Sequence, residues 1–200
     1  MNNIIIIGSG GHSLSSISII ESLALYKISG IIDNKLEAVS KLKYSLIGND
    51  LDLEKLRKKF NNAFVGIGHV KNYESRLKMY NQLKELNYNL PNIIAQSAII
   101  AEESSIKEST IVMNGVIIGP QAEVGYNSII NTSSTIEHGS KIGNNTHIST
   151  GVVINGDVKI GNNTFIGSGS IIREGISIGS QCFIKMGSLI TKDIEDNEQI

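Results

Sequence analysis

Cysteine, net charge and long hydrophobic runs are all scarce in this sequence of 200 residues. A single cysteine, Cys182, excludes a disulfide framework within one chain and fits a reducing compartment. The formal charge of −1 provides no basic field for nucleic acid and no polybasic patch for a membrane surface. No apolar run approaches the ~20 residues of a membrane span, and the N-terminus lacks the basic segment and long apolar core of a signal peptide. These absences predict a cytoplasmic chain that binds neither nucleic acid nor membrane.

A period of six residues runs through the second half of the sequence. Every sixth position from Ile100 onward is Ile or Val, without a gap or a slip of register. These positions are Ile100, Ile106, Val112, Ile118, Val124, Ile130, Ile136, Ile142, Ile148, Ile154, Ile160, Ile166, Ile172, Ile178, Ile184 and Ile190. A small or β-branched residue follows four positions after each of them, and glycine often follows directly. A hexapeptide period of this kind predicts a parallel β-helix.

The physical basis of that prediction is the burial of the aliphatic residues. One six-residue unit cannot bury its own Ile or Val, but three units close a triangular coil, so that residues eighteen apart stack on one another. The stacked side chains then fill the interior, and backbone hydrogen bonds run from coil to coil. An Ile-rich antiparallel sheet is the alternative, and the unbroken repeat disfavours it. We predict a β-helix of about five coils.

The first half of the sequence begins with a βαβ pattern. The aliphatic run 4–7 predicts a strand buried on both faces, the residues from Ser13 to Tyr26 have helical spacing, and 28–32 predicts a second strand. The glycine-rich turn 8–12 between the first strand and the helix presents N–H groups at a helix N-terminus. Such a turn suits a phosphate or pyrophosphate.

This glycine-rich turn is an incomplete dinucleotide fingerprint. The fingerprint requires a third glycine where Ser13 stands, so NAD binding is disfavoured. Two interpretations stay open, which are the binding of a nucleotide-sugar phosphate and a purely structural turn.

The chain continues as a small α/β layer before the repeats begin. We expect a loop at 46–50, a helix at 51–60, a strand at 63–68, a helix at 71–86 and an extended exit strand at 90–94. The sequence therefore predicts a Rossmann-like domain over residues 1–95, which would bind a nucleotide sugar, followed by a β-helix domain over residues 96–200.

One histidine of the repeat region, His138, is a candidate base for acyl transfer. His138 lies two residues past Ile136, so its side chain belongs to the wall of the coil, and a step of eighteen residues leads to Gly156. A neutral imidazole can take a proton from an attacking amine or hydroxyl, and a fixed backbone N–H can hold a developing oxyanion. A solvated wall histidine is the equal alternative. Zinc ligation needs three histidines, and the repeat region has only His138 and His147, so we predict no metal site.

At these positions the chain resembles a known family. The segments 8–12 (GSGGH), 131–138 (NTSSTIEH) and 155–158 (NGDV), together with His147, are similar to bacterial sugar acetyltransferases of the NeuD/PglD type, a branch of the hexapeptide-repeat acyltransferases. The resemblance implies a left-handed β-helix, a homotrimer with active sites in clefts between prisms, and acetyl-CoA as the co-substrate.

The resemblance also implies a role for each matching residue. His138 would be the general base, with Glu137 as a candidate to steady it. The Gly156 N–H would contact the acetyl-CoA thioester, and His147, Ser168 and Met186 would line the cofactor site. The acceptor sugar and its nucleotide would be bound by Gly10, Gly11, His12 and Asp33, with His12 coming from a neighbouring subunit.

One departure from the family concerns the residue after the base. Aminosugar members carry an acidic residue there, which steadies the histidine, whereas this chain has Gly139. Glu-His-Gly is typical of members that O-acetylate sialic acid, but His12 and His147 match the aminosugar pattern better.

We therefore expect acetyl transfer to the 4-amino group of a nucleotide-linked amino-dideoxy sugar, for the synthesis of a surface glycan or for protein glycosylation. The mechanism would be direct attack in a ternary complex. The alternatives are O-acetylation of sialic acid or a related nonulosonic acid, and a non-catalytic β-helix scaffold, because fold does not imply function.

Overall fold

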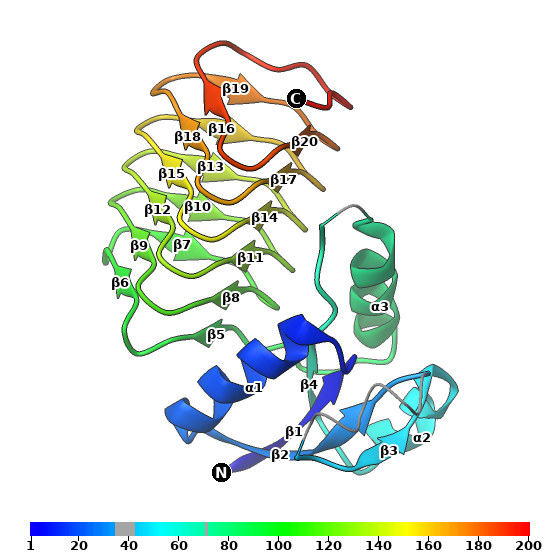
Figure 1. The fold of residues 1–200 in the computed structure, drawn as a ribbon. Helices are drawn as coiled ribbons and strands as arrows, with labels where there is room; N and C mark the ends of the chain where they lie inside the picture. Colours follow the sequence, from blue (N-terminus) through cyan, green and yellow to red (C-terminus); the bar gives the residue numbers. More distant parts are fainter. Residues whose placement is uncertain (35–42, 71) are drawn as a thin grey trace.

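The computed structural model describes residues 1–34, 43–70 and 72–200, as a small α/β layer beside a tall prism (Figure 1). The N-terminal layer holds a parallel sheet of order β3-β2-β1-β4. Its strands are β1 (Asn2–Ile7), β2 (Tyr26–Ile32), β3 (Leu46–Gly48) and β4 (Asn62–Val65). Its helices are α1 (Gly11–Leu23), the short 3₁₀ helix η2 (Asp50–Asp52), α2 (Leu53–Arg57) and α3 (Glu74–Glu85).

The four isoleucines of β1 are buried on both faces of the sheet, as their continuous run predicts. Alternate residues of a strand point to opposite faces. Ile4 and Ile6 pack with α1 and with the prism, whereas Ile5 and Ile7 pack with side chains of α2 and α3. The run therefore forms the middle of two separate apolar clusters.

Two short elements differ from the sequence-based expectation. Leu46–Gly48, expected within a loop, forms the edge strand β3, which pairs with β2 through Ile31 and Ile32. The helix expected over 51–60 is divided into η2 and α2, and a capping box of Asn49 and Asp52 begins it. A strand of three residues is too short to display a periodicity, so the pairing with β2 is what defines it. The start of the helix expected over 71–86 lies outside the described residues at position 71, and the described helix α3 begins at Glu74.

The prism is built from two-residue strands in three parallel sheets, one sheet on each face. The covered face, which the N-terminal layer overlies, has β5 (Ile93–Ile94), β8 (Ile111–Val112), β11 (Ile129–Ile130), β14 (His147–Ile148), β17 (Phe165–Ile166) and β20 (Phe183–Ile184). The apolar face has β6 (Ile99–Ile100), β9 (Ile117–Ile118), β12 (Thr135–Ile136), β15 (Val153–Ile154), β18 (Ile171–Ile172) and β21 (Leu189–Ile190). The charged face has β7 (Ser105–Ile106), β10 (Glu123–Val124), β13 (Lys141–Ile142), β16 (Lys159–Ile160) and β19 (Ser177–Ile178).

The eighteen-residue stacking predicted from the repeat is confirmed by the strand register. Thr135 pairs with Val153, and Ile136 pairs with Ile154, one coil later. The second residue of each strand points inward, and these Ile and Val side chains form one continuous core. The prism already begins at β5, whose two residues extend the covered face. The division of the chain at residues 95 and 96 stays a prediction.

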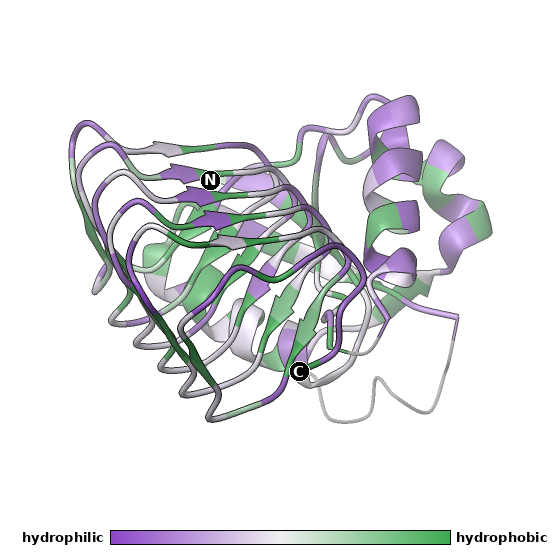
Figure 2. Ribbon diagram, turned by 90° about the horizontal axis from the view of Figure 1, so that it is seen from above, coloured by the Kyte–Doolittle hydropathy of each residue, from purple (hydrophilic) through white to green (hydrophobic). Residues whose placement is uncertain are grey.

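The outward residues give each face its character. On the covered face Ile111 and Ile129 are fully buried against α1 and the sheet. On the apolar face Ile99 and Leu189 keep 65% and 69% of their surface exposed. The charged face carries the ion pair of Lys141 with Glu123 at 2.8 Å. Figure 2 shows the difference between the purple strands of the charged face and the green strands of the apolar face.

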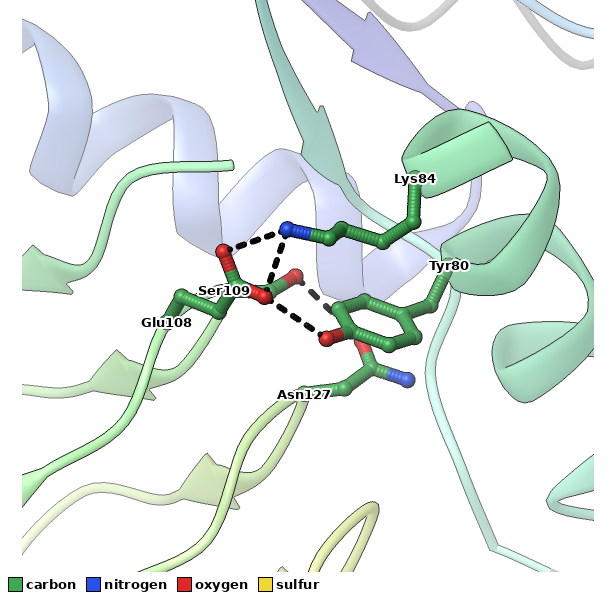
Figure 3. A network of polar contacts seen from close by, with 5 residues as sticks. All are labelled: Tyr80, Lys84, Glu108, Ser109 and Asn127. Atoms are coloured by element: carbon green, nitrogen blue, oxygen red, sulfur yellow. Dashed lines mark hydrogen bonds and ion pairs between the residues drawn. The ribbon is translucent and has the colours of Figure 1, made fainter. Parts of the chain in front are cut away.

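A polar network joins α3 to the prism (Figure 3). The hydroxyl of Tyr80 donates to Glu108 at 2.9 Å, and the Lys84 ammonium reaches the same carboxylate at 2.8 Å. The Tyr80 ring stacks on Tyr126 with 4.8 Å between the centroids. These contacts hold the N-terminal layer against the covered face.

The helices of the protein are short, since α1 and α3 have 13 and 12 residues. Within residues 1–34, 43–70 and 72–200, no helix combines the length and the apolar character that crossing a bilayer requires. The same residues contain no group of three or more His, Cys, Asp and Glu side chains arranged to share a metal ion.

Candidate active site

His138 lies against the bare backbone of the next coil. It follows β12 at the corner between the apolar and charged faces, and 65% of its side chain is exposed. A Cβ atom built on Gly156 would lie 2.5 Å from both Cε1 and Nε2 of the imidazole. The eighteen-residue step from 138 to 156 therefore brings these positions together, as the repeat predicted. Only glycine leaves room for the ring at this place.

Backbone and carboxylate groups surround this corner. The N–H of Asp157 donates to the carbonyl of His138 at 2.9 Å, which fastens the two coils together. Glu137 has one carboxylate oxygen 4.0 Å from Nδ1 of His138. In the described part of the chain the Gly156 N–H has no hydrogen-bond acceptor. The corner thus combines an imidazole, a carboxylate and a free backbone donor.

The glycine-rich turn lies at the carboxyl ends of β1 and β2. Gly8 adopts φ +98°, and its N–H donates to the carbonyl of Ile32 at 2.7 Å. Gly10 and Gly11 begin α1, and a Cβ atom on either would meet no atom within 4 Å. Open space therefore lies beside N–H groups at a helix N-terminus, which is an arrangement that accepts an anion.

Ser13 explains why the third glycine of the dinucleotide fingerprint is absent. Its hydroxyl is fully buried and bridges the carbonyls of Gly8 and Gly66, at 2.6 and 3.0 Å. Ser13 thereby joins the turn after β1 to the turn after β4. Beside it, Ser9 donates to the carboxylate of Asp33 at 2.5 Å, which places Asp33 next to the same turn.

A cluster of three histidines fills the junction of the N-terminal layer with the prism. His147 points outward from β14 and is buried, with Nδ1 against the carbonyl oxygen of His69. The amide of Asn131 donates to Nε2 of His147 at 3.3 Å. A carbonyl can only accept, so these partners assign the proton of a neutral His147 to Nδ1. Nε2 of His12 and Nδ1 of His69 are sealed from solvent without a hydrogen-bond partner among the described residues.

Burial keeps all three rings neutral. Desolvation lowers the pKa of His147 to about 4 and that of His69 to about 3. The pKa of His12 is also held well below its ordinary value by burial, with further contributions from Arg76 and His147. The histidines at this junction are therefore hydrogen-bonding and packing groups at neutral pH.

Arg76 of α3 is the buried charge beside this cluster. Its guanidinium donates to four carbonyls, which belong to Val65, Ile67, Asn127 and Ser109, at 2.6 to 3.4 Å. The carbonyl of Val65 lies at the end of β4, that of Ile67 lies just after it, and the other two lie on corners of the prism. Burial lowers the pKa of Arg76 to about 9. Arg76 thus fastens the turn that carries His69 to the prism.

The candidate residues are divided between different edges of one prism. Ser168 and Met186 follow β17 and β20, at the corner between the covered and apolar faces, and both are exposed. His138 and Gly156 lie at the corner between the apolar and charged faces, which is opposite the covered face. His147 lies on the covered face, and His12 lies on α1 of the N-terminal layer. One chain therefore does not bring the predicted base together with the predicted acceptor pocket.

Sequence reasoning missed Arg76, Asn131 and the carbonyl of His69. Arg76 lies on the same side of α3 as Tyr80 and Leu83, which are spaced as one buried stripe. That spacing is the signal that could have identified a buried arginine. Nothing in the sequence indicated that the turn after β4 reaches His147.

Two protein families match the chain. The family described as the PglD N-terminal domain matches residues 3–83, and that described as the hexapeptide repeat of succinyl-transferase matches residues 157–192. Among curated protein sequences none matches the chain.

Solved structures match the chain over 98–100% of its length. PerB from Caulobacter crescentus, solved with CoA and GDP-perosamine, is 26% identical, and the match covers 98% of this chain and 92% of PerB with a TM-score of 0.91. The acetyltransferase domain of PglB from Neisseria gonorrhoeae, solved with acetyl coenzyme A, is 24% identical, with coverages of 100% and 96% and a TM-score of 0.92. WeeI from Acinetobacter baumannii is 18% identical, with coverages of 100% and 96% and a TM-score of 0.88. These matches confirm the expected fold class, a Rossmann-like layer followed by a left-handed parallel β-helix.

Proposed function

We propose that this chain, a hexapeptide-repeat acetyltransferase of the NeuD/PglD type, transfers the acetyl group of acetyl-CoA to the 4-amino group of a nucleotide-linked amino-dideoxy sugar. The observation that carries the proposal is the imidazole of His138 lying on the Gly156 backbone. The Caulobacter relative, described as a GDP-perosamine N-acetyl transferase, was solved with CoA and with GDP-perosamine, a nucleotide-linked sugar. That match supports an amine acceptor on a nucleotide-linked sugar.

His138 acts as the general base in this reaction. It takes a proton from the acceptor amine while the amine nitrogen attacks the thioester carbon. The C–N bond forms, the C–S bond breaks, and the proton passes to the departing sulfur of CoA. The Gly156 N–H donates to the thioester oxygen as negative charge develops on it, a contact worth about 3 kcal/mol in comparable sites. Glu137, with a carboxylate oxygen 4.0 Å from Nδ1, is the candidate residue that orients the ring.

The remaining candidate residues bind the acceptor sugar and the coenzyme. Gly10 and Gly11 offer N–H groups to the phosphates of the nucleotide sugar, with Asp33 beside the same turn. His12 faces the sugar. Ser168 and Met186 line the coenzyme cleft, and Ser168 is held by a hydrogen bond of 2.8 Å with Ser149. His147 lines the same cleft from the edge of the covered face.

The active form is a homotrimer in which neighbouring prisms complete each site. The outward residues Ile99, Ile117, Ile171 and Leu189 are apolar and exposed towards both ends of the apolar face, with Thr135 and Val153 between them. A second copy of the prism covers this face. Its glycine-rich turn and covered-face edge then approach the His138 corner of the first copy, which one chain cannot achieve by itself.

O-acetylation of sialic acid is the less favoured alternative. A sialic acid carries its own carboxylate, which Glu137 beside the base would repel, whereas the attacking amine carries no negative charge. The matched structures with described sugar ligands also carry a nucleotide-linked sugar.

An assay of CoA thiol release tests this function. The parent chain, offered acetyl-CoA with a UDP- or GDP-linked 4-amino sugar, should release thiol and form an amide, and His138→Gln should lower kcat about 10²- to 10⁴-fold. Lys159→Gln, an exposed change on the charged face, is the matched control and should leave kcat unchanged. Full activity of His138→Gln would remove this histidine as the base. Turnover of sialic acid but of no amino sugar would establish the alternative.

A further inference from the structure

We propose that a pocket at one edge of the covered face binds an uncharged N-acetylated amino sugar, at a second site apart from the His138 corner. The pocket has a volume of about 480 Å³, within the ~300–1,000 Å³ that is usual for small-molecule sites. It lies where the loop between β4 and α3 extends beside the upper strands of the covered face (Figure 1).

The pocket uses the third corner of the prism. Its residues Asn163 and Gln181 lie between the charged and covered faces. His138 lies on the corner between the apolar and charged faces, and Ser168 lies on the corner between the covered and apolar faces. The pocket is therefore separate from the groups assigned to acetyl transfer.

A ladder of asparagine amides leads along this corner to the pocket. Asn127 donates to Oδ1 of Asn145 at 2.8 Å, and Asn145 donates to Oδ1 of Asn163 at 2.9 Å. Asn163 is the last member, and its amide nitrogen has no acceptor among the residues that the structure describes. Because hydrogen bonds in a chain polarise one another, the free donor at the end of this ladder is strengthened.

A second amide donor lies one coil above Asn163. The hydroxyl of Tyr73 donates to Oε1 of Gln181 at 2.9 Å, which holds this amide in place. The amide nitrogen of Gln181 also has no acceptor within the described part of the chain. The pocket therefore offers two N–H groups, one from each amide, to oxygen atoms of a ligand.

The wall beside these donors is aromatic. Phe165 and Phe183 point outward from β17 and β20, and their rings stack with 5.1 Å between the centroids. Phe165 is buried, whereas Phe183 is half-buried and lines the pocket. The buried ring of His69 lies against Phe165, with 6.3 Å between the centroids. A methyl group or the C–H face of a sugar ring can pack on such a surface.

The charges around the pocket select a neutral ligand. None of the described residues that line it is charged at neutral pH, since burial lowers the pKa of His69 to about 3. Burial raises the pKa of Cys182, another lining residue, and the carboxylates of Asp196 and Glu198 raise it further. A phosphate or carboxylate group would therefore meet negative charge without a cationic partner among these residues.

An acetamido group matches this set of contacts. Its carbonyl oxygen accepts from the amides of Asn163 and Gln181, its methyl group packs on Phe183, and it carries no charge. N-acetylated amino sugars are also the product class of the proposed reaction. The source of the ligand, but not its chemistry, rests on that proposed function.

Saturation-transfer NMR with the full chain, in the absence of acetyl-CoA, tests the pocket. Methyl N-acetyl-β-glucosaminide should bind with a Kd of about 1 mM, and its acetyl methyl group should receive the strongest saturation. Methyl β-glucoside and methyl β-glucosaminide lack the acetyl group and should bind at least about tenfold more weakly.

Two variants remove the donors and keep the local structure. Asn163→Asp retains an acceptor for Asn145 and suits the left-handed φ of +59°, but it replaces the free donor by an oxygen. Gln181→Glu does the same at an exposed position and retains an acceptor for Tyr73. Each should weaken binding of the N-acetylated probe about tenfold. Gln121→Glu, the same exchange at the same φ of +59° on another corner, is the matched control and should bind like the parent.

Every result of these titrations decides the inference. It is overturned if the N-acetylated probe does not bind, if the three sugars bind equally, or if both donor variants bind like the parent. His138→Gln should also bind like the parent, and loss of binding there would place the probe at the reaction site instead. Because these titrations measure no acetyl transfer, a failure of the proposed function appears only in the thiol-release assay and leaves the binding result intact.

Discussion

The guanidinium of Arg76 donates to the carbonyl of Asn127 across the junction between α3 and the prism, at 2.9 Å. Its remaining donors reach carbonyls on both sides of that junction. The position of His69, and through its carbonyl the orientation of His147, therefore depends on one buried side chain.

Replacing Arg76 tests this dependence. Arg76→Met should lower the free energy of unfolding by about 2–4 kcal/mol, because four carbonyls lose a donor at about 1 kcal/mol each. Arg76→Lys, with fewer donors, should lose less. Urea unfolding followed by circular dichroism measures both. A stability gain in Arg76→Met would show that the cost of burying the charge exceeds its hydrogen bonds.

Gly156→Ala should separate activity from stability. The added Cβ would lie 2.5 Å from the His138 ring, and that ring is exposed and free to turn outward. We expect kcat to fall about 10- to 100-fold while Tm changes by less than about 2 °C. Combined with His138→Gln, the alanine should cause little further loss. Additive losses would mean that Gly156 does not act through the ring.

The histidine cluster should make the fold sensitive to acid. The folded-state pKa values of His147 and His69, about 4 and about 3, lie below the value of about 6.5 in an unfolded chain. Between pH 6.5 and 4 the unfolded chain therefore binds protons that the folded chain does not, so stability falls as pH falls. At pH 5 each buried ring should cost about 2 kcal/mol, and above pH 7 it should cost nothing. Calorimetry across this range should show a falling Tm, and a Tm that is constant to pH 5 would contradict the burial of neutral rings.

The apolar face should control assembly. Ile171 keeps 45% of its surface exposed in one chain, and Ile171→Lys places a charge on the face that a second prism would cover. Light scattering during gel filtration should give a trimer for the parent and smaller species for Ile171→Lys. Ser177→Lys, on the charged face, should remain trimeric. An unchanged mass in Ile171→Lys would place the contact between copies elsewhere.

The β-helix could be predicted from the sequence because the six-residue pattern of Ile and Val is local and repeated. A period of six residues defines the coil, the coil defines the step of eighteen, and that step predicted the contact of His138 with Gly156. The sequence did not show which face the N-terminal layer covers. Outward residues are aliphatic on two faces, as with Ile111 on one and Ile117 on the other, so only tertiary packing distinguishes them. Arg76 was missed for a related reason, since its partners come from distant turns.

The corner of His138, opposite the covered face, has a genetic consequence. An allele without His138 and an allele without His12 would each encode a chain that lacks one half of the proposed site. In mixed forms of the proposed homotrimer, an intact His138 corner from one product meets an intact glycine-rich turn from the other. Two defective alleles expressed in one cell should then restore part of the turnover that neither supports alone.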